Sequence, residues 1–128
     1  MIYHCIIYLS SKSYLENKGL LEPHLNIDEL YKDIDGLSLF SGTCHGLFGK
    51  LFDKGRFDEI TKIYEKLSST FLDRFYLEIQ RHGDQNEVSF EKYNLSQSSK
   101  LEIPIIATNE VFYLNQDMFE AHNALISI

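Results

Sequence analysis

The sequence predicts an α/β domain in which strands and helices alternate and the strands pair in parallel. Three short apolar runs, near residues 37–41, 75–80 and 103–107, have the length and composition of buried strands. Each run is followed by polar turn residues, and helical spacing of apolar residues comes next; successive βα units of this kind form a parallel sheet or part of a barrel. With 128 residues, the chain holds at most one domain of modest size.

The composition excludes several classes of protein. Hydrophobic residues make up 44% and charged residues 24%, which is typical of globular proteins. A net charge of −7 argues against a protein that binds the phosphate backbone of nucleic acids, because such proteins are usually basic. No apolar run reaches the roughly 18 residues of a membrane span. Cys5 and Cys44 have no CxxC spacing, which is typical of reduced thiols. We therefore expect a cytoplasmic domain with no membrane contact and no direct nucleic-acid binding.

The first 35 residues are predicted to lead into the βα units. Residues 6–15 are apolar, and their pattern fits a strand as well as a helix. Residues 20–26, with Pro23 among them, are predicted to form a loop. Ile27–Ile34 follows as a short predicted helix, with Asn26 as its N-cap and acidic residues in its first turn.

Residues 36–128 are predicted to hold the βα units themselves. Apolar residues recur at helical spacing from Phe57 to Phe71 and predict a helix of four turns. Phe75–Ile79 is rich in aromatic and β-branched residues and predicts a strand. The other expected elements are a buried strand at Leu37–Phe40, a helix at Glu87–Lys100, a strand at Ile103–Ala107 and a helix at Asn115–Ile126. Both chain ends are apolar, so we expect an incomplete domain.

Polar residues follow each predicted strand. In parallel architectures, functional residues collect in the loops after the carboxyl ends of the strands. These loops are Ser41–Gly46, Gln80–Gly83 and Thr108–Phe112. We therefore look for a functional site where these three loops meet.

Four ordered segments resemble one protein family. Residues 73–83 have the sequence DRFYLEIQRHG, which resembles the DRFYLELQRHG signature in the N-terminal polymerase-and-histidinol-phosphatase (PHP) domain of bacterial DNA polymerase III alpha subunits. GLSLFSGTCHG at 36–46, IPIIATNEVFYL at 103–114 and FEAHNALISI at 119–128 resemble further motifs of that domain in the same order. YLSSKSY at 8–14 resembles one of its helices, so residues 6–15 are expected to be helical.

The resemblance implies a partial, distorted (β/α)7 barrel, with residues 1–35 as a helical lead-in and residues 36–128 as βα units of one domain truncated at both ends. It implies that the chain is a fragment of a polymerase alpha subunit, whose parent activity is DNA-directed DNA polymerisation with Mg²⁺ during DNA replication. The fragment would serve as a structural and docking part without the polymerase palm. The implied partners are the remainder of the alpha subunit and the proofreading exonuclease subunit. We expect the chain alone to be inactive, with no catalytic residue and no cofactor.

The family's metal positions are mostly degraded in this chain. In metal-binding relatives, a Cys, an Asp and a His bind metal at the positions that hold Thr43, Glu110 and Phe112 here. Only Glu110 keeps a good ligand, so no metal is expected. Cys44 and His45 are interpreted as a small apolar thiol and a surface imidazole.

The acidic pair Asp33 and Asp35 has the spacing of the family's palm carboxylates, but it falls between the predicted short helix and the first strand. We interpret it as a solvated turn.

The remaining polar candidates form a possible cluster at the barrel mouth. Its members are Glu78, Arg81, His82, Asn109 and His122. One interpretation is a contact for a phosphate or a partner. The other is a structural cluster that bridges adjacent loops, with His122 packing on the last helix.

Two other functions stay open at this point. The first is a free-standing metal-dependent phosphoesterase or exonuclease of the PHP type that binds its metal through Glu78, His82, Cys44 and Glu110. Binding of Zn²⁺ or Mn²⁺ with a rise in melting temperature would favour it. The second is a non-functional remnant of a truncated gene, which should expose apolar edges and aggregate.

Overall fold

The computed structural model describes residues 2–15, 23–32 and 34–127. Asp33 of the predicted acidic turn and residues 20–22 of the predicted loop lie outside these ranges. Within them, no helix is both long enough and apolar enough to cross a bilayer.

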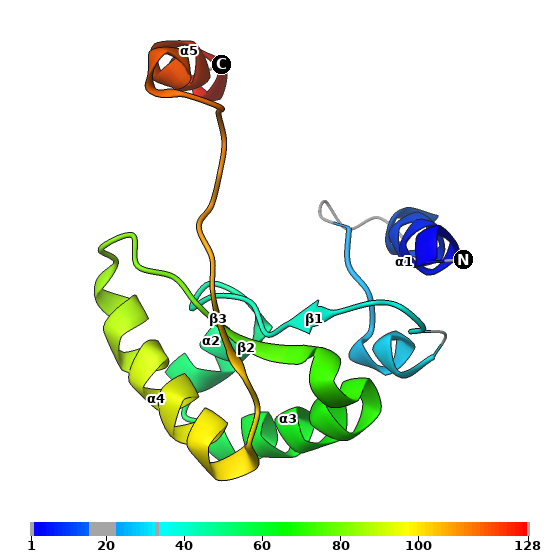
Figure 1. Ribbon diagram of the computed structural model, residues 1–128. Coiled ribbons are helices and arrows are strands. Elements are labelled where there is room, and N and C mark those ends of the chain that lie inside the picture. The colour runs from blue at the N-terminus through cyan, green and yellow to red at the C-terminus, as the bar shows by residue number, and fades with distance from the viewer. Residues whose placement is uncertain (1, 16–22, 33, 128) are drawn as a thin grey trace.

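Three parallel strands form a sheet in the order β1-β2-β3 (Figure 1). They are β1 (Leu39–Phe40), β2 (Phe75–Ile79) and β3 (Ile105–Ala107). Leu39 pairs with Phe75, and Leu77 pairs with Ile105, so β2 is the central strand. The prediction of an α/β chain with parallel strands is confirmed.

Two strands are shorter than predicted. The strand expected at 37–41 is only Leu39–Phe40, because the N–H of Leu37 donates to the carbonyl of Ile34 and closes a turn there. Phe40 is 43% exposed, so the prediction that this strand is buried is wrong at that residue. The strand expected at 103–107 begins at Ile105, after Pro104, which has no N–H to donate.

The two long helices follow the predictions closely. The helix α3 (Phe57–Phe71) has the bounds that the apolar spacing indicated, and it buries Ile60, Tyr64, Leu67 and Phe71. The helix α4 (Gln85–Leu101) begins two residues before the predicted start, because Asp84 caps it. The Asp84 carboxylate accepts from the N–H of Asn86, and Glu87 completes a capping box.

A third helix was not predicted. The helix α2 (Leu47–Asp53) directly follows the loop after β1, and its N-cap is Gly46. Gly49 lies at its centre against the backbone of Cys44, and a Cβ atom there would be 1.8 Å from the Cys44 carbonyl oxygen. Glycine therefore lets α2 approach the preceding turn more closely than any other residue would allow.

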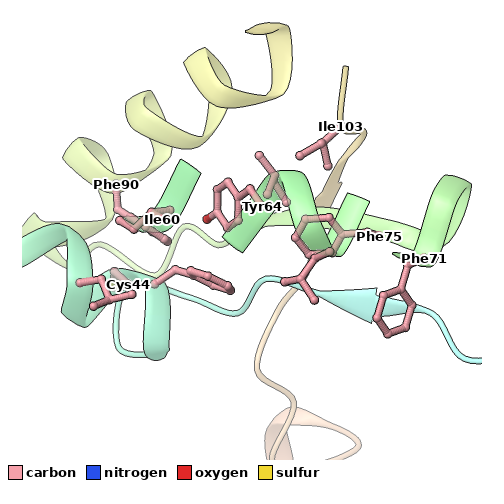
Figure 2. Packing of buried hydrophobic residues seen from close by; sticks show 11 residues of the cluster. Cys44, Ile60, Tyr64, Phe71, Phe75, Phe90 and Ile103 are labelled. Carbon is pink, nitrogen blue, oxygen red and sulfur yellow. The ribbon is translucent and has the colours of Figure 1, made fainter. Parts of the chain in front are cut away.

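The core fills the space between the sheet and these helices. Figure 1 shows α2, α3 and α4 gathered on one side of the strands. Figure 2 shows the buried cluster, in which Tyr64, Phe71 and Phe75 are among the largest fully buried side chains. The hydroxyl of Tyr64 donates to Asn94 Oδ1 at 3.0 Å, and Asn94 Nδ2 donates to the carbonyl of Glu78 at 3.3 Å. Asn94 thus joins α3, α4 and β2 by hydrogen bonds inside the core.

Two helices are described before β1, and they include the helix expected at residues 6–15 and a shorter form of the one expected at Ile27–Ile34. The helix α1 spans Ile2–Leu15, and a short 3-10 helix, η1 (Ile27–Tyr31), follows with Asn26 as its N-cap. Lys12 Nζ lies 2.7 Å from Glu29 Oε2 and joins α1 to η1. The guanidinium of Arg74 donates to the carbonyls of Ile34 and Leu37 at 3.2 and 3.0 Å, so the lead-in segment is also tied to the start of β2.

The C-terminal helix stands apart from the sheet. The predicted helix at Asn115–Ile126 is divided into a 3-10 turn, η3 (Gln116–Met118), and α5 (Phe119–Ile126). Figure 1 shows α5 at the far end of an extended segment that leaves β3. No residue of α5 is buried.

Candidate functional site

The loops after the three strands lie side by side at the carboxyl edge of the sheet. The N–H of Ser41, just after β1, donates to the carbonyl of Tyr76, and the Ser41 hydroxyl accepts from the N–H of Glu78 at 2.9 Å. The N–H of Thr108, just after β3, donates to the carbonyl of Ile79 at 3.1 Å. The structure therefore brings the three predicted loops to one edge.

Glu78 is held by polar neighbours at the centre of this edge. Its carboxylate accepts a hydrogen bond from the Thr108 hydroxyl and another from Gln80 Nε2 at 3.2 Å. Gln80 Nε2 also donates to Thr108 Oγ1 at 2.9 Å. The three side chains form a closed network between β2 and the loop after β3.

Arg81 is paired with the following helix. Its Nε donates to Glu91 Oε2 at 3.0 Å, and a terminal nitrogen donates to Glu91 Oε1 at 2.6 Å. This bidentate hydrogen bond lowers the pKa of the Glu91 carboxyl and raises the pKa of Arg81. The guanidinium is therefore engaged by a carboxylate of the same chain.

Glu87 binds the backbone of the loop after β2. Its carboxylate accepts from the N–H groups of His82, Gly83 and Asp84 at 2.9–3.2 Å. Gly83 adopts a φ of +93°, a left-handed conformation that favours glycine. The carboxylate and this turn position the start of α4 against the carboxyl edge of the sheet.

His82 connects α4 with the loop after β3. Its Nδ1 lies 3.3 Å from Glu87 Oε1, and the N–H of Glu110 points to its Nε2 at 3.5 Å. A neutral imidazole with its proton on Nδ1 satisfies both contacts at once. His82 therefore bridges adjacent loops.

The residues at the three family metal positions each contact different neighbours. Thr43 Oγ1 accepts from the N–H of His45 at 3.3 Å, within the turn before α2. The ring of Phe112 is 64% exposed and stacks on His122 at 5.2 Å between centroids. Glu110 contacts His82 through its backbone N–H.

The predicted polar cluster is only partly assembled. Glu78 and His82 each reach the loop after β3, whereas Arg81 turns to Glu91. Asn109 is exposed in that loop. His122, in α5, contacts the rings of Phe112 and Tyr113 in the segment that leads to this helix.

A different group of ligand-type residues was missed by the sequence analysis. Cys44, His45 and Asp84 have ligand atoms that all lie within 4.8 Å of one another, and across the described ranges this is the one such group of three. Cys44 is 8% exposed, whereas the His45 side chain is 71% exposed. The expectation of a buried thiol and a surface imidazole is confirmed, but Asp84 is close to both because the loops after β1 and β2 are neighbours.

Comparison with known proteins agrees with the motifs. A family profile described as PHP domain matches residues 2–82. The chain is 31% identical over 126 residues to the DNA polymerase III subunit alpha of Vibrio cholerae, 32% over 120 residues to that of Caulobacter vibrioides, and 33% over 126 residues to that of Haemophilus influenzae. These matches cover 94–98% of this chain but only 10–11% of each relative.

Proposed function

The chain belongs to the PHP domain family, and from that membership we propose that it is a structural and docking part of the PHP domain of a DNA polymerase III alpha subunit. In this proposal DNA-directed DNA polymerisation, with its Mg²⁺, belongs to other parts of the subunit. The chain would act in the cytoplasm and contact the remainder of that subunit and the proofreading exonuclease subunit.

The observation that carries the proposal is the pairing of polar groups at the carboxyl edge. Glu78 is bound by Thr108 and Gln80, Glu91 by Arg81, and Glu87 by backbone N–H groups. Metal-dependent phosphoester hydrolysis needs ligands that converge on an ion and leave a position for water. The carboxylates of Glu78, Glu87 and Glu91 instead join strands, loops and α4 to one another, which supports a structural role for these three residues.

The sheet also supports a place within a larger barrel. In the described part of the chain, β1 and β3 each pair with β2 alone. Each therefore has one edge whose backbone groups are free to pair with a further strand. A distorted (β/α)7 barrel would supply such strands on both sides.

An activity assay separates this proposal from the phosphoesterase alternative. The 128-residue chain is incubated with bis(p-nitrophenyl) phosphate, or with a single-stranded oligonucleotide, in the presence of Mn²⁺, Zn²⁺ or Mg²⁺. We expect no hydrolysis above the metal-only blank. Hydrolysis that is lost in Glu78→Gln but kept in Glu65→Gln, a change on the exposed face of α3, would overturn the proposal.

The docking part of the proposal has its own test. The immobilised chain is titrated with the purified proofreading exonuclease subunit of the same organism, and we expect saturable binding. Absence of binding would refute the contact with this subunit. The gene-remnant alternative predicts aggregates, so a monodisperse chain with a cooperative melt would count against that alternative.

A further inference from the structure

Three side chains from two loops meet beside the start of α4. Cys44 and His45 come from the turn before α2, and Asp84 is the N-cap of α4. We propose that Cys44, His45 and Asp84 form a binding site for a single divalent cation of borderline softness, such as Zn²⁺. The site goes beyond the proposed structural role and uses none of the family positions Thr43, Glu110 and Phe112.

The separations fit a small tetrahedral ion. His45 Nε2 lies 3.2 Å from Asp84 Oδ2. Zn–N and Zn–O bonds of about 2.0–2.1 Å at a tetrahedral angle place the two ligand atoms about 3.3–3.4 Å apart. The Cys44 sulfur lies within 4.8 Å of a ligand atom of each of the other two residues. The Zn–S bond is longer, about 2.3 Å, so the sulfur has to move closer to the other two ligand atoms when the ion binds.

The donor set selects the class of ion. Thiolate and imidazole favour zinc over magnesium or calcium, which prefer oxygen ligands. Three protein ligands leave a fourth position, and the 71% exposure of the His45 side chain opens that position to solvent. The ion would therefore carry one water molecule and could enter directly from the surface.

The ligands are already held in place by the fold. Asp84 Oδ1 accepts from the N–H of Asn86 at 2.7 Å, and this cap leaves Oδ2 directed toward His45. Thr43 Oγ1 accepts from the N–H of His45, and the N–H of Gly46 donates to the carbonyl of Thr43 at 3.0 Å. Neighbouring residues rarely share one ion, but this turn brings both side chains to Asp84. Such outer hydrogen bonds fix the orientation of metal ligands.

The local charge also suits a cation. Burial raises the pKa of the Cys44 thiol, and the carboxylates of Asp84 and Glu87 raise it further. The thiol must lose its proton to solvent when it binds a metal, and the charge of a divalent ion offsets both effects. The same carboxylates that disfavour a free thiolate therefore favour a bound cation.

Cobalt is a suitable probe, because a Co²⁺–thiolate bond gives a near-ultraviolet charge-transfer band that does not depend on activity. The reduced, metal-free 128-residue chain is titrated with Co²⁺ and then with Zn²⁺. We expect one Co²⁺ per chain, a charge-transfer band, and loss of that band as Zn²⁺ displaces cobalt. Cys44→Ser should abolish the band, whereas the matched control Cys5→Ser, in α1, should retain it.

Two further variants keep the test independent of folding. Asp84→Asn removes the charge but keeps a good helix cap, and His45→Ala changes an exposed side chain. Each should weaken Co²⁺ binding at least about tenfold, since even outer-shell changes weaken metal binding by that much. The proposal is overturned if no band forms in the folded chain, if the band survives Cys44→Ser, or if His45→Ala and Asp84→Asn both bind Co²⁺ as tightly as the parent.

Discussion

Replacing Gly49 with alanine should destabilise the chain, although alanine is the better helix former. The new Cβ would lie 1.8 Å from the carbonyl oxygen of Cys44 and 2.2 Å from its carbonyl carbon. Contacts below 3.0 Å are essentially never seen for a Cβ, so the two backbone segments must separate by more than about 1 Å. Neither can yield by rotating a side chain.

Two opposing contributions decide whether Gly49→Ala raises or lowers stability: the higher helix propensity of alanine and the overpacking caused by its Cβ. Alanine in place of glycine favours a helix by about 1 kcal/mol. Overpacking of a core typically costs about 1–3 kcal/mol and more where backbone must move. We therefore expect the free energy of unfolding to fall by about 2 kcal/mol or more. For a domain of this size, that corresponds to a melting temperature about 8 °C lower.

The assay is thermal and urea unfolding followed by far-UV circular dichroism, with Lys50→Ala as the control. Lys50 is the next residue in α2 and its side chain is exposed, so its replacement should change stability by less than about 0.5 kcal/mol. A Gly49→Ala chain as stable as the parent would show that α2 does not approach the Cys44 turn this closely, and the reasoning would fail.

Three other predictions concern polar contacts. Asn94→Leu should lower the free energy of unfolding by about 3 kcal/mol in urea titrations, because it leaves the buried Tyr64 hydroxyl without its acceptor. Glu87→Ala should lower it by about 1–2 kcal/mol in the same assay, because the capping box is lost. The pKa of Glu91 is lowered by Arg81, so its contribution to stability is present above the ordinary carboxyl pKa of 4.5 and is lost as the pH falls through the lowered value. The difference in melting temperature between the parent and Glu91→Gln should therefore shrink from about pH 6 to about pH 3.

Glu65→Ala, an exposed change on α3, serves as a control for these variants and should be nearly neutral. An Asn94→Leu chain more stable than the parent would mean that the hydrogen bonds within the core do not form. If Glu87→Ala and Glu65→Ala had the same free energy of unfolding, the cap would be ruled out as a stabilising contact. If the difference in melting temperature between the parent and Glu91→Gln stays constant with pH, the ion pair between Glu91 and Arg81 is excluded.

The sequence predicted those elements whose side-chain pattern is long and regular. The apolar spacing of α3 continues over four turns, and Phe75–Ile79 has strong strand propensity, so both were found with their observed bounds. By contrast, α2 has only seven residues with a glycine in the middle, and it is stabilised by its contact with the turn that holds Cys44. That contact is tertiary and leaves no periodic signal.

The sequence predicted where the candidate site lies, but not which of its side chains contact one another. The rule that loops gather at the carboxyl edge of parallel strands correctly grouped the three loops. It could not show that Arg81 would select Glu91 on the facing turn of α4. Nor could the rule predict that Asp84 lies close to Cys44 and His45, because this proximity depends on β1 and β2 being neighbours in the sheet. The sequence signal that was available is the N-cap pattern from Asp84 to Glu87, which places Asp84 at a loop end.

The strand order has a consequence for synthesis on the ribosome. Strands that are neighbours in the sheet are also consecutive along the chain, and each parallel pair is closed by the helices between its members. The nascent chain can therefore pair β1 with β2 as soon as β2 has emerged after α3, and β3 adds later to an existing template. Each step closes one connection that holds its own helices and joins no strands from more distant parts of the chain, which limits the entropy loss. In this order of assembly, β3 is the last strand of the described sheet to pair.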